Sequence, residues 1–284
     1  MTDFAAYIVS FRPADPTDRS LRLTNLMRQI TWWQAKTSVP INLFASGWTE
    51  AEFERHPVMR DFGKGAGKII FLPSQSLVMN RHACLSAFYE SSFSWGVMMD
   101  DDAILYDTDH NCGPHLFDEM SRNGVHAYDG VDVFFPIDPR KQPFTRRWEA
   151  DPDLYGKHHV FNRDLDLKGS MFVVRNFQKE GRAPVYPDPN FALHGEDTLF
   201  ALTCVAQGYT VMRCWNIVLK ELPGPSFFGD NRIAAMKAGN EELARRFAHL
   251  GLNMRPDSHL LDRRDFQESL WREKPKKAVV RKSA

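Results

Sequence analysis

The sequence predicts a single α/β domain in which helices flank a mainly parallel β-sheet. Short apolar runs of β-forming residues alternate with longer amphipathic stretches along the first half of the chain, as in parallel sheets whose strands are joined by helices. The length of 284 residues and the hydrophobic fraction of 43% suit one large globular domain. We expect this domain to cover residues 1–270, followed by a basic tail, 271–284, that is disordered in isolation.

The first half of the chain predicts four strands joined by helices. The strands are the apolar runs 5–11, 41–45, 68–72 and 94–99. A helix is expected from the N-cap Ser20, because apolar residues then recur on one helical face: Leu23, Leu26, Met27, Ile30 and Trp33. A second helix is expected over residues 76–91, directly before the fourth strand.

The second half predicts further strands and helices around one long loop. Strands are expected over residues 131–136, 167–177 and 209–215, and helices over residues 113–123, 196–207 and 231–250. Between residues 138 and 166 the chain is polar and contains prolines and aromatic residues. This segment is either an active-site loop or poorly ordered, because long loops in compact domains are usually functional when they are ordered.

Charge and cysteine content narrow the possible classes of protein. The 36 Lys and Arg residues balance the 36 Asp and Glu residues, so no overall charge attracts nucleic acid or a membrane. The four cysteines show no paired spacing, which argues against a disulfide framework and a structural zinc site. The chain shows no signal peptide and no apolar run long enough to span a bilayer, so we expect a soluble, cytoplasmic protein without a membrane partner.

Three consecutive carboxylates end the fourth predicted strand. Asp100, Asp101 and Asp102 follow the apolar run directly, and adjacent like charges repel one another. A fold tolerates such a group at a strand end when Mg²⁺ or Mn²⁺ neutralises it and bridges to substrate phosphates. The alternative is a solvated acidic turn, but the buried strand that precedes the aspartates favours the metal site.

The pair Asp100 and Asp102 resembles the Asp-x-Asp motif of GT-A glycosyltransferases, whose fold contains a Rossmann-like sheet. The resemblance implies that Mn²⁺ or Mg²⁺ binds the diphosphate of a nucleotide-sugar, first of all a UDP-sugar, with Asp102 as the principal ligand and Asp100 as its partner. It also implies that residues 1–110 bind the donor and residues 111–270 the acceptor. Asp101 is expected on the donor side, and a third metal ligand stays open among His194, His249 and His259.

A second acidic motif, His194-Gly195-Glu196-Asp197, opens a predicted helix. It resembles the Glu-Asp motif of inverting GT-A enzymes, in which a carboxylate deprotonates the acceptor hydroxyl. The resemblance makes Asp197 the first candidate for the general base and Glu196 the second, with His194 beside the acceptor. The alternative is simple capping, because acidic residues at a helix N-terminus complement its dipole.

Further contacts with the donor are implied by position within the same family pattern. Gly169 and Ser170 precede a β-type run, where GT-A enzymes often contact the donor sugar; an ordinary strand entry is the alternative. Arg81 lies in a segment similar to an Arg-Asn region that contacts the nucleotide or the diphosphate, although the residue order is reversed here, and arginine suits phosphate. In open α/β sheets ligands bind at the carboxyl ends of strands, where Ser10 and Arg12 would hold the nucleoside.

The acceptor is predicted from a narrower resemblance and from the long loop. The Met-Asp-Asp-Asp and Gly-Glu-Asp-Thr-Leu-Phe stretches are similar to those of bacteriophage enzymes that glycosylate hydroxymethylated pyrimidines in DNA. In the loop, Arg146, Arg147 and Trp148 would contact phosphates and stack on a displaced base. DNA is therefore the expected acceptor, in the host cytoplasm if a phage encodes the protein. The alternatives are carbohydrate, lipid and protein acceptors.

Three other classes of protein share part of this pattern. A nucleotidyltransferase should carry a Gly-rich phosphate loop after its first strand, where this chain has Ser10-Phe11-Arg12-Pro13. A phosphotransferase with an aspartyl nucleophile should place its Asp-x-Asp after the first strand and not after the fourth. A non-catalytic nucleic-acid-binding module would leave the aspartates of a buried strand unexplained. The sequence thus favours a metal-dependent glycosyltransferase.

Overall fold

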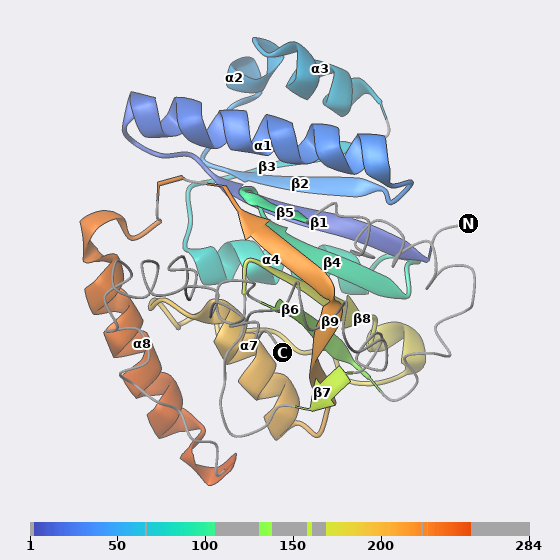
Figure 1. Cartoon of the computed structure of the whole chain (residues 1–284), viewed down its shortest axis with the longest axis vertical. Helices are drawn as coiled ribbons and strands as arrows, with labels where there is room; N and C mark the ends of the chain where they lie inside the picture. Colours follow the sequence, from blue (N-terminus) through green and yellow to red (C-terminus); the bar gives the residue numbers. More distant parts are fainter. Residues whose placement is uncertain are drawn as a thin grey trace, which may run out of the picture.

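The computed structural model describes residues 3–65, 67–105, 131–137, 158–160, 169–222, 224–225 and 227–250. Its first half is a parallel sheet built from β1 (Phe4–Phe11), β2 (Ile41–Ser46), β3 (Lys68–Leu72) and β4 (Trp95–Asp100). These strands pair in the order β3-β2-β1-β4 (Figure 1). The four strands predicted in this half are therefore confirmed.

The second half of the chain extends the sheet beyond β4 with mixed pairing. Its strands are β5 (Ala103–Leu105), β6 (Val133–Ile137), β7 (His158–Val160), β8 (Met171–Arg175) and β9 (Val211–Glu221). β8 lies antiparallel between β4 and β6, and β6 pairs in parallel with β9, which also carries β5 and β7 antiparallel to it. The predicted fold class is confirmed, and β9 runs well beyond the predicted stretch.

Helices cover both faces of the sheet and bury a separate apolar core on each. On one face lie α1 (Pro16–Lys36), α2 (Glu50–Glu54) and α3 (Pro57–Lys64), whose Leu26, Phe53 and Phe62 pack with alternate residues of β1 and β4. On the other face lie α4 (Leu77–Tyr89) and α7 (Glu196–Ala206). A small third core joins α7 to α8 (Arg232–Arg246), which lies at the side of the molecule in Figure 1.

One helix, α1, begins earlier than the sequence predicted, because an earlier residue caps it. α1 begins at Pro16 and not at Ser20, because the Asp15 carboxylate accepts hydrogen bonds from the backbone amides of Thr17 and Asp18. α2 and α3 were not predicted, since they are shorter than the roughly 11 residues over which a helical period is read from a sequence. The predicted helices over 76–91, 196–207 and 231–250 are confirmed as α4, α7 and α8, with Ser76 capping α4.

Several predictions fall outside the residues that the structure describes. These are the helix over 113–123, most of the loop over 138–166, and the basic tail over 271–284. Within the described ranges, every helix is too short or too polar to serve as a membrane span.

Candidate active site

Acidic side chains from the end of β4, the start of α7 and the end of β9 gather at the carboxyl end of β4. They are Asp100, Asp101, Asp102, Glu196, Asp197 and Glu221, which we call the acidic cluster. Charge interactions join Asp100 to Asp197 and Asp102 to Glu221. The two acidic motifs seen in the sequence therefore lie together, and Glu221, which the sequence analysis did not single out, joins them.

Hydrogen bonds to distant parts of the chain hold the aspartate turn in place. The backbone N–H of Asp100 donates to the carbonyl of Ser170 at 2.8 Å, and that of Leu222 donates to the carbonyl of Asp102 at 2.7 Å. The Ser170 hydroxyl donates to Glu221 Oε1 at 2.7 Å. The turn is thus fixed between the start of β8 and the end of β9.

Arg81 of α4 joins the two acidic motifs from one face of the sheet. Its Nη2 donates to Asp100 Oδ1 at 2.7 Å and lies 3.9 Å from Glu196 Oε1, and its side chain is 1% exposed. Burial acts to lower the pKa of Arg81, but the charges of Asp100 and Glu196 outweigh it and the pKa is raised. The guanidinium predicted to contact the donor therefore lies buried between two carboxylates.

Residues of α1 hold the aspartate turn from the other face. Arg22 Nη1 donates to Asp101 Oδ1, and both side chains are buried. Gln29 Nε2 donates to the carbonyl of Asp100 at 2.7 Å and to that of Ala103 at 2.5 Å. Polar side chains of α1 thus bind the aspartate turn. The sequence pattern did not indicate this role for Arg22 or Gln29.

Burial raises the pKa of four carboxyl groups in the acidic cluster, those of Asp100, Asp101, Asp102 and Glu196. The pKa of Asp100 rises to about 6 because of burial, which Arg81 opposes and neighbouring carboxylates reinforce. Burial and nearby carboxylates raise the pKa of Asp102 and that of Glu196 to about 8. Of the described basic side chains, Arg22 and Arg81 form ion pairs with the cluster, so two guanidinium groups face six carboxylates. Full ionisation would leave an excess of negative charge among these described groups, part of which a divalent cation would offset.

We expect the metal-free protein to lose stability as the pH rises from about 4 to about 8. Asp100, Asp102 and Glu196 have raised pKa values when folded, so over this window the native state binds more protons than the unfolded state. By linkage, the free energy of unfolding then falls as the pH rises. Denaturant unfolding in the presence of a chelator measures this dependence, and a free energy of unfolding that increases across the window would contradict it.

Asp197 occupies the space beside Gly169. A Cβ atom on Gly169 would lie 1.0 Å from Asp197 Oδ2, so only glycine leaves room for this carboxylate. Oδ1 of Asp197 accepts a hydrogen bond from the backbone N–H of Thr198 at 2.7 Å. Gly169 was predicted for its approach to the donor; in the structure its lack of a side chain serves Asp197.

Helix α8 supports the turn that carries the second motif. Gly195 has a φ of 105°, a left-handed conformation that favours glycine. In α8, a Cβ atom on Gly239 would lie 2.1 Å from the carbonyl oxygen of His194. The helix backbone therefore packs directly on this turn, and Gly239 is needed for the close approach.

The other predicted site residues lie around the cluster or outside the described chain. Ser10 is buried, accepts a hydrogen bond from Trp48 Nε1 at 3.0 Å, and bonds to Asp101 in a way that lowers the pKa of that carboxyl. Arg12 pairs with Glu52 at 2.7 Å, and the His194 ring lies 5.6 Å from that of Phe228. The structure does not describe Arg146, Arg147, Trp148 and His259, whereas it places His249 at the protein surface.

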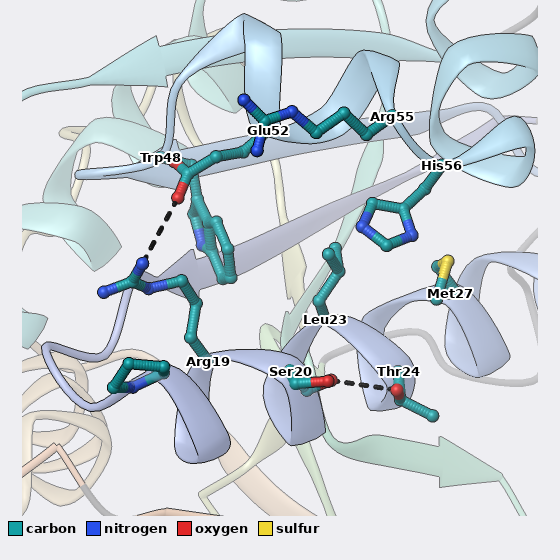
Figure 2. Close-up of a pocket in the computed structure, with 10 residues that line it drawn as sticks. Arg19, Ser20, Leu23, Thr24, Met27, Trp48, Glu52, Arg55 and His56 are labelled. Carbon is teal, nitrogen blue, oxygen red and sulfur yellow. Dashed lines mark hydrogen bonds and ion pairs between the residues drawn. The ribbon is translucent and has the colours of Figure 1, made fainter.

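A pocket of about 220 Å³ lies between α1 and the α2–α3 pair (Figure 2). Leu23 and Met27 of α1 lie opposite His56, and Arg19 faces Glu52 at 3.8 Å. Trp48 also lines the pocket, and its Nε1 donates to the Ser10 hydroxyl at 3.0 Å. The pocket is lined by none of the cluster's carboxylates.

A metal ion bound at the acidic cluster would need further ligands besides the described side chains. Among the described residues, no three Asp, Glu, His or Cys side chains stand as a ready-made set of ligands. The chemistry of the cluster nevertheless fits a hard divalent cation, because its donors are carboxylate oxygens and the side chain of Asp102 is 23% exposed. Substrate phosphates and water supply the remaining ligands at many Mg²⁺ sites.

The comparisons with known proteins identify the fold. No protein-family model matches the sequence, and no curated protein shows significant sequence similarity to it. The fold matches that of the mannosyltransferase PcManGT from Pyrobaculum calidifontis, solved with GDP-Man and Mn²⁺, with a TM-score of 0.54 and 11% identity over 94% of this chain and 69% of that one. It also matches TarS residues 1–349 from S. aureus, with a TM-score of 0.50 and 9% identity over 92% and 73% of the two chains. The fold is thus of the GT-A type, as expected.

Proposed function

We propose that the protein is a metal-dependent glycosyltransferase that moves a sugar from a nucleotide-sugar to an acceptor hydroxyl. The observation that carries this proposal is the acidic cluster, in which six carboxylates meet two guanidinium groups of the described chain at the carboxyl end of β4. Ligands bind at this end of the strands in open α/β sheets. A solved protein of the same fold, PcManGT, holds GDP-Man and Mn²⁺.

Asp102 is the proposed principal ligand of Mn²⁺ or Mg²⁺, and Asp100 is its partner. Asp100 is tied to Arg81, whereas Asp102 lies 4.0 Å from Arg22 and keeps part of its side chain exposed. A cation bound there would stabilise the charge that develops on the departing nucleoside diphosphate. Asp101, which is buried against Arg22, supports the turn, and Ser10 and Arg12 remain the proposed contacts with the nucleoside.

Asp197 is the proposed general base. A base must reach the acceptor hydroxyl, and Asp197 is partly exposed whereas Glu196 is buried beside Arg81. The loss of a proton from the acceptor hydroxyl to the Asp197 carboxylate would prepare that oxygen for attack on the sugar. Gly169 supports this role because it leaves the space that the carboxylate fills.

The proposed acceptor is a hydroxymethylated pyrimidine in DNA. The basic and aromatic residues around Arg146, Arg147 and Trp148 support this proposal, which rests on the sequence because the structure does not describe them. The proposal assigns donor binding to residues 1–110 and acceptor binding to residues 111–270. The alternative acceptors are a carbohydrate, a lipid or a protein, to which the same transfer reaction would apply.

We expect one nucleoside diphosphate to raise the melting temperature of the protein only when Mn²⁺ is present. A ligand that binds the folded state stabilises it by mass action, and a cation held by Asp102 and Asp100 would offset the repulsion between the diphosphate and the acidic cluster. A thermal-shift panel of UDP, GDP, CDP and ADP, each with and without Mn²⁺, measures this and identifies the nucleotide of the donor. If no nucleotide gives a metal-dependent shift, the proposed function is wrong.

A further inference from the structure

Arg22 contacts three parts of the chain that meet beside Asp102. Its Nη1 donates to Asp101 Oδ1, and its Nη2 donates to the carbonyl of Pro225. The guanidinium also lies over the ring of Phe11, with its central carbon 3.9 Å from the ring centroid. Arg22 is 6% exposed, so its guanidinium has little contact with water.

Pro225 belongs to the connection between β9 and α8, which we define by its described residues Leu222, Gly224, Pro225, Phe227 and Phe228. Figure 1 shows this part of the chain, in orange, leading from the end of β9 towards α8. A Cβ atom on Gly224 would lie at ordinary contact distance, 3.7 Å, from Asp102 Oδ2, so the backbone of the connection passes beside this carboxylate. The connection therefore forms one wall beside the carboxylate proposed to hold the metal.

The same connection also contacts the end of β1 and the turn before α7. The ring of Phe227 meets that of Phe11, at the end of β1, edge to face with centroids 5.1 Å apart. The ring of Phe228 lies 5.6 Å from that of His194, in the turn that carries Asp197. Arg22 links this connection to the aspartate turn, because one nitrogen of its guanidinium donates to Pro225 and another donates to Asp101.

We infer that Arg22 is a positioning residue that fastens the β9–α8 connection against the aspartate turn and thereby sets the affinity for the metal–donor complex. The inference rests on the proposed function for the identity of that complex. A guanidinium donates through two arms in a fixed plane, so Arg22 can bind Asp101 and Pro225 at once. A lysine there would keep the positive charge beside Asp101 and lose the second, fixed donor.

Arg22→Lys should therefore loosen the connection without removing the buried charge pair. We expect hydrogen exchange of the Leu222 amide, which is bonded to the Asp102 carbonyl, to become at least about tenfold faster, as follows from the loss of one hydrogen bond to a charged group. We expect the KM for the donor to rise by about tenfold for the same reason, while kcat stays within about twofold. The matched control is Arg28→Lys, at an exposed position of the same helix, which should change neither quantity.

A second variant separates the role of Arg22 from a general weakening of the fold. Phe227→Leu removes the ring contact with Phe11 and should also speed exchange at Leu222, and the double variant should be less than additive because both changes release the same connection. Unchanged exchange in Arg22→Lys would overturn the inference, and so would faster exchange with an unchanged KM. If the wild-type protein shows no metal-dependent nucleotide shift, the proposed function fails, and the exchange result alone then decides whether Arg22 fastens the connection.

Discussion

Replacing Asp102 with asparagine is expected to lower the rate of sugar transfer by about 10²–10³-fold, the scale on which a lost charge-stabilising group slows catalysis. The change keeps the shape of the side chain and removes the charge that holds the cation. Because burial and neighbouring carboxylates raise the pKa of Asp102 to about 8, the ionised group is costly in the metal-free protein. The variant should thus be at least as stable as the wild type. Release of nucleoside diphosphate at saturating donor and Mn²⁺ measures the loss.

Two comparisons make the Asp102 result specific. Asp61→Asn makes the same chemical change at an exposed position of α3 and should leave the rate unaltered. Asp197→Asn should also abolish turnover, yet keep the Mn²⁺-dependent shift with the nucleotide, because it removes the base and not the metal ligand. Turnover near the wild-type rate in Asp102→Asn would remove the central claim.

Replacing Arg81 with methionine is expected to destabilise the protein by about 3–5 kcal/mol, as happens when one partner of a buried ion pair is removed. Methionine roughly fills the space of the side chain but leaves Asp100 and Glu196 without the cation that lies between them. Arg81 is 1% exposed, so water cannot replace it without rearrangement of the core. Denaturant unfolding in the presence of a chelator measures the loss.

Two further variants test whether the Arg81 effect comes from leaving the carboxylates of Asp100 and Glu196 without their partner. Arg28→Met, at an exposed position of α1, should change the free energy of unfolding by no more than about 0.5 kcal/mol. Adding Glu196→Gln to Arg81→Met should recover part of the lost stability, because one of the two unpaired carboxylates is then neutral. A loss below about 1 kcal/mol for Arg81→Met would show that the ion pair is not needed for the fold.

The sequence predicted those parts of the fold whose signal is local. The strands β1 to β4 appear as apolar runs between helical stretches, and α4 and α7 are confirmed within a few residues of their predicted limits. The start of α1 was misplaced because a carboxylate, Asp15, caps the helix earlier than Ser20 could. Helices α2 and α3 were missed because five or eight residues are fewer than the roughly 11 over which a helical period is read from a sequence.

The residues of the candidate site also divide into those that a local sequence motif indicates and those that only the folded structure indicates. Two short motifs in the sequence were enough to select Asp100, Asp102, Glu196 and Asp197. Arg22 was not selected, because its partner Asp101 lies 79 residues away and one arginine on an amphipathic helix carries no distinguishing pattern. Gly239 was missed for a similar reason, since only the packing of α8 on His194 shows that a side chain there would clash.

By itself the sequence determined the α/β class, the strand that ends in three aspartates, and the acidic residues of the second motif, because each depends on the chemistry of neighbouring residues. Only the tertiary structure decided that these groups share one cluster, that Arg81 and Arg22 hold it from opposite faces of the sheet, and that Glu221 joins it. Such contacts depend on how strands and helices distant in sequence are brought together, and burial among those elements also raises the pKa values of Asp100 and Glu196.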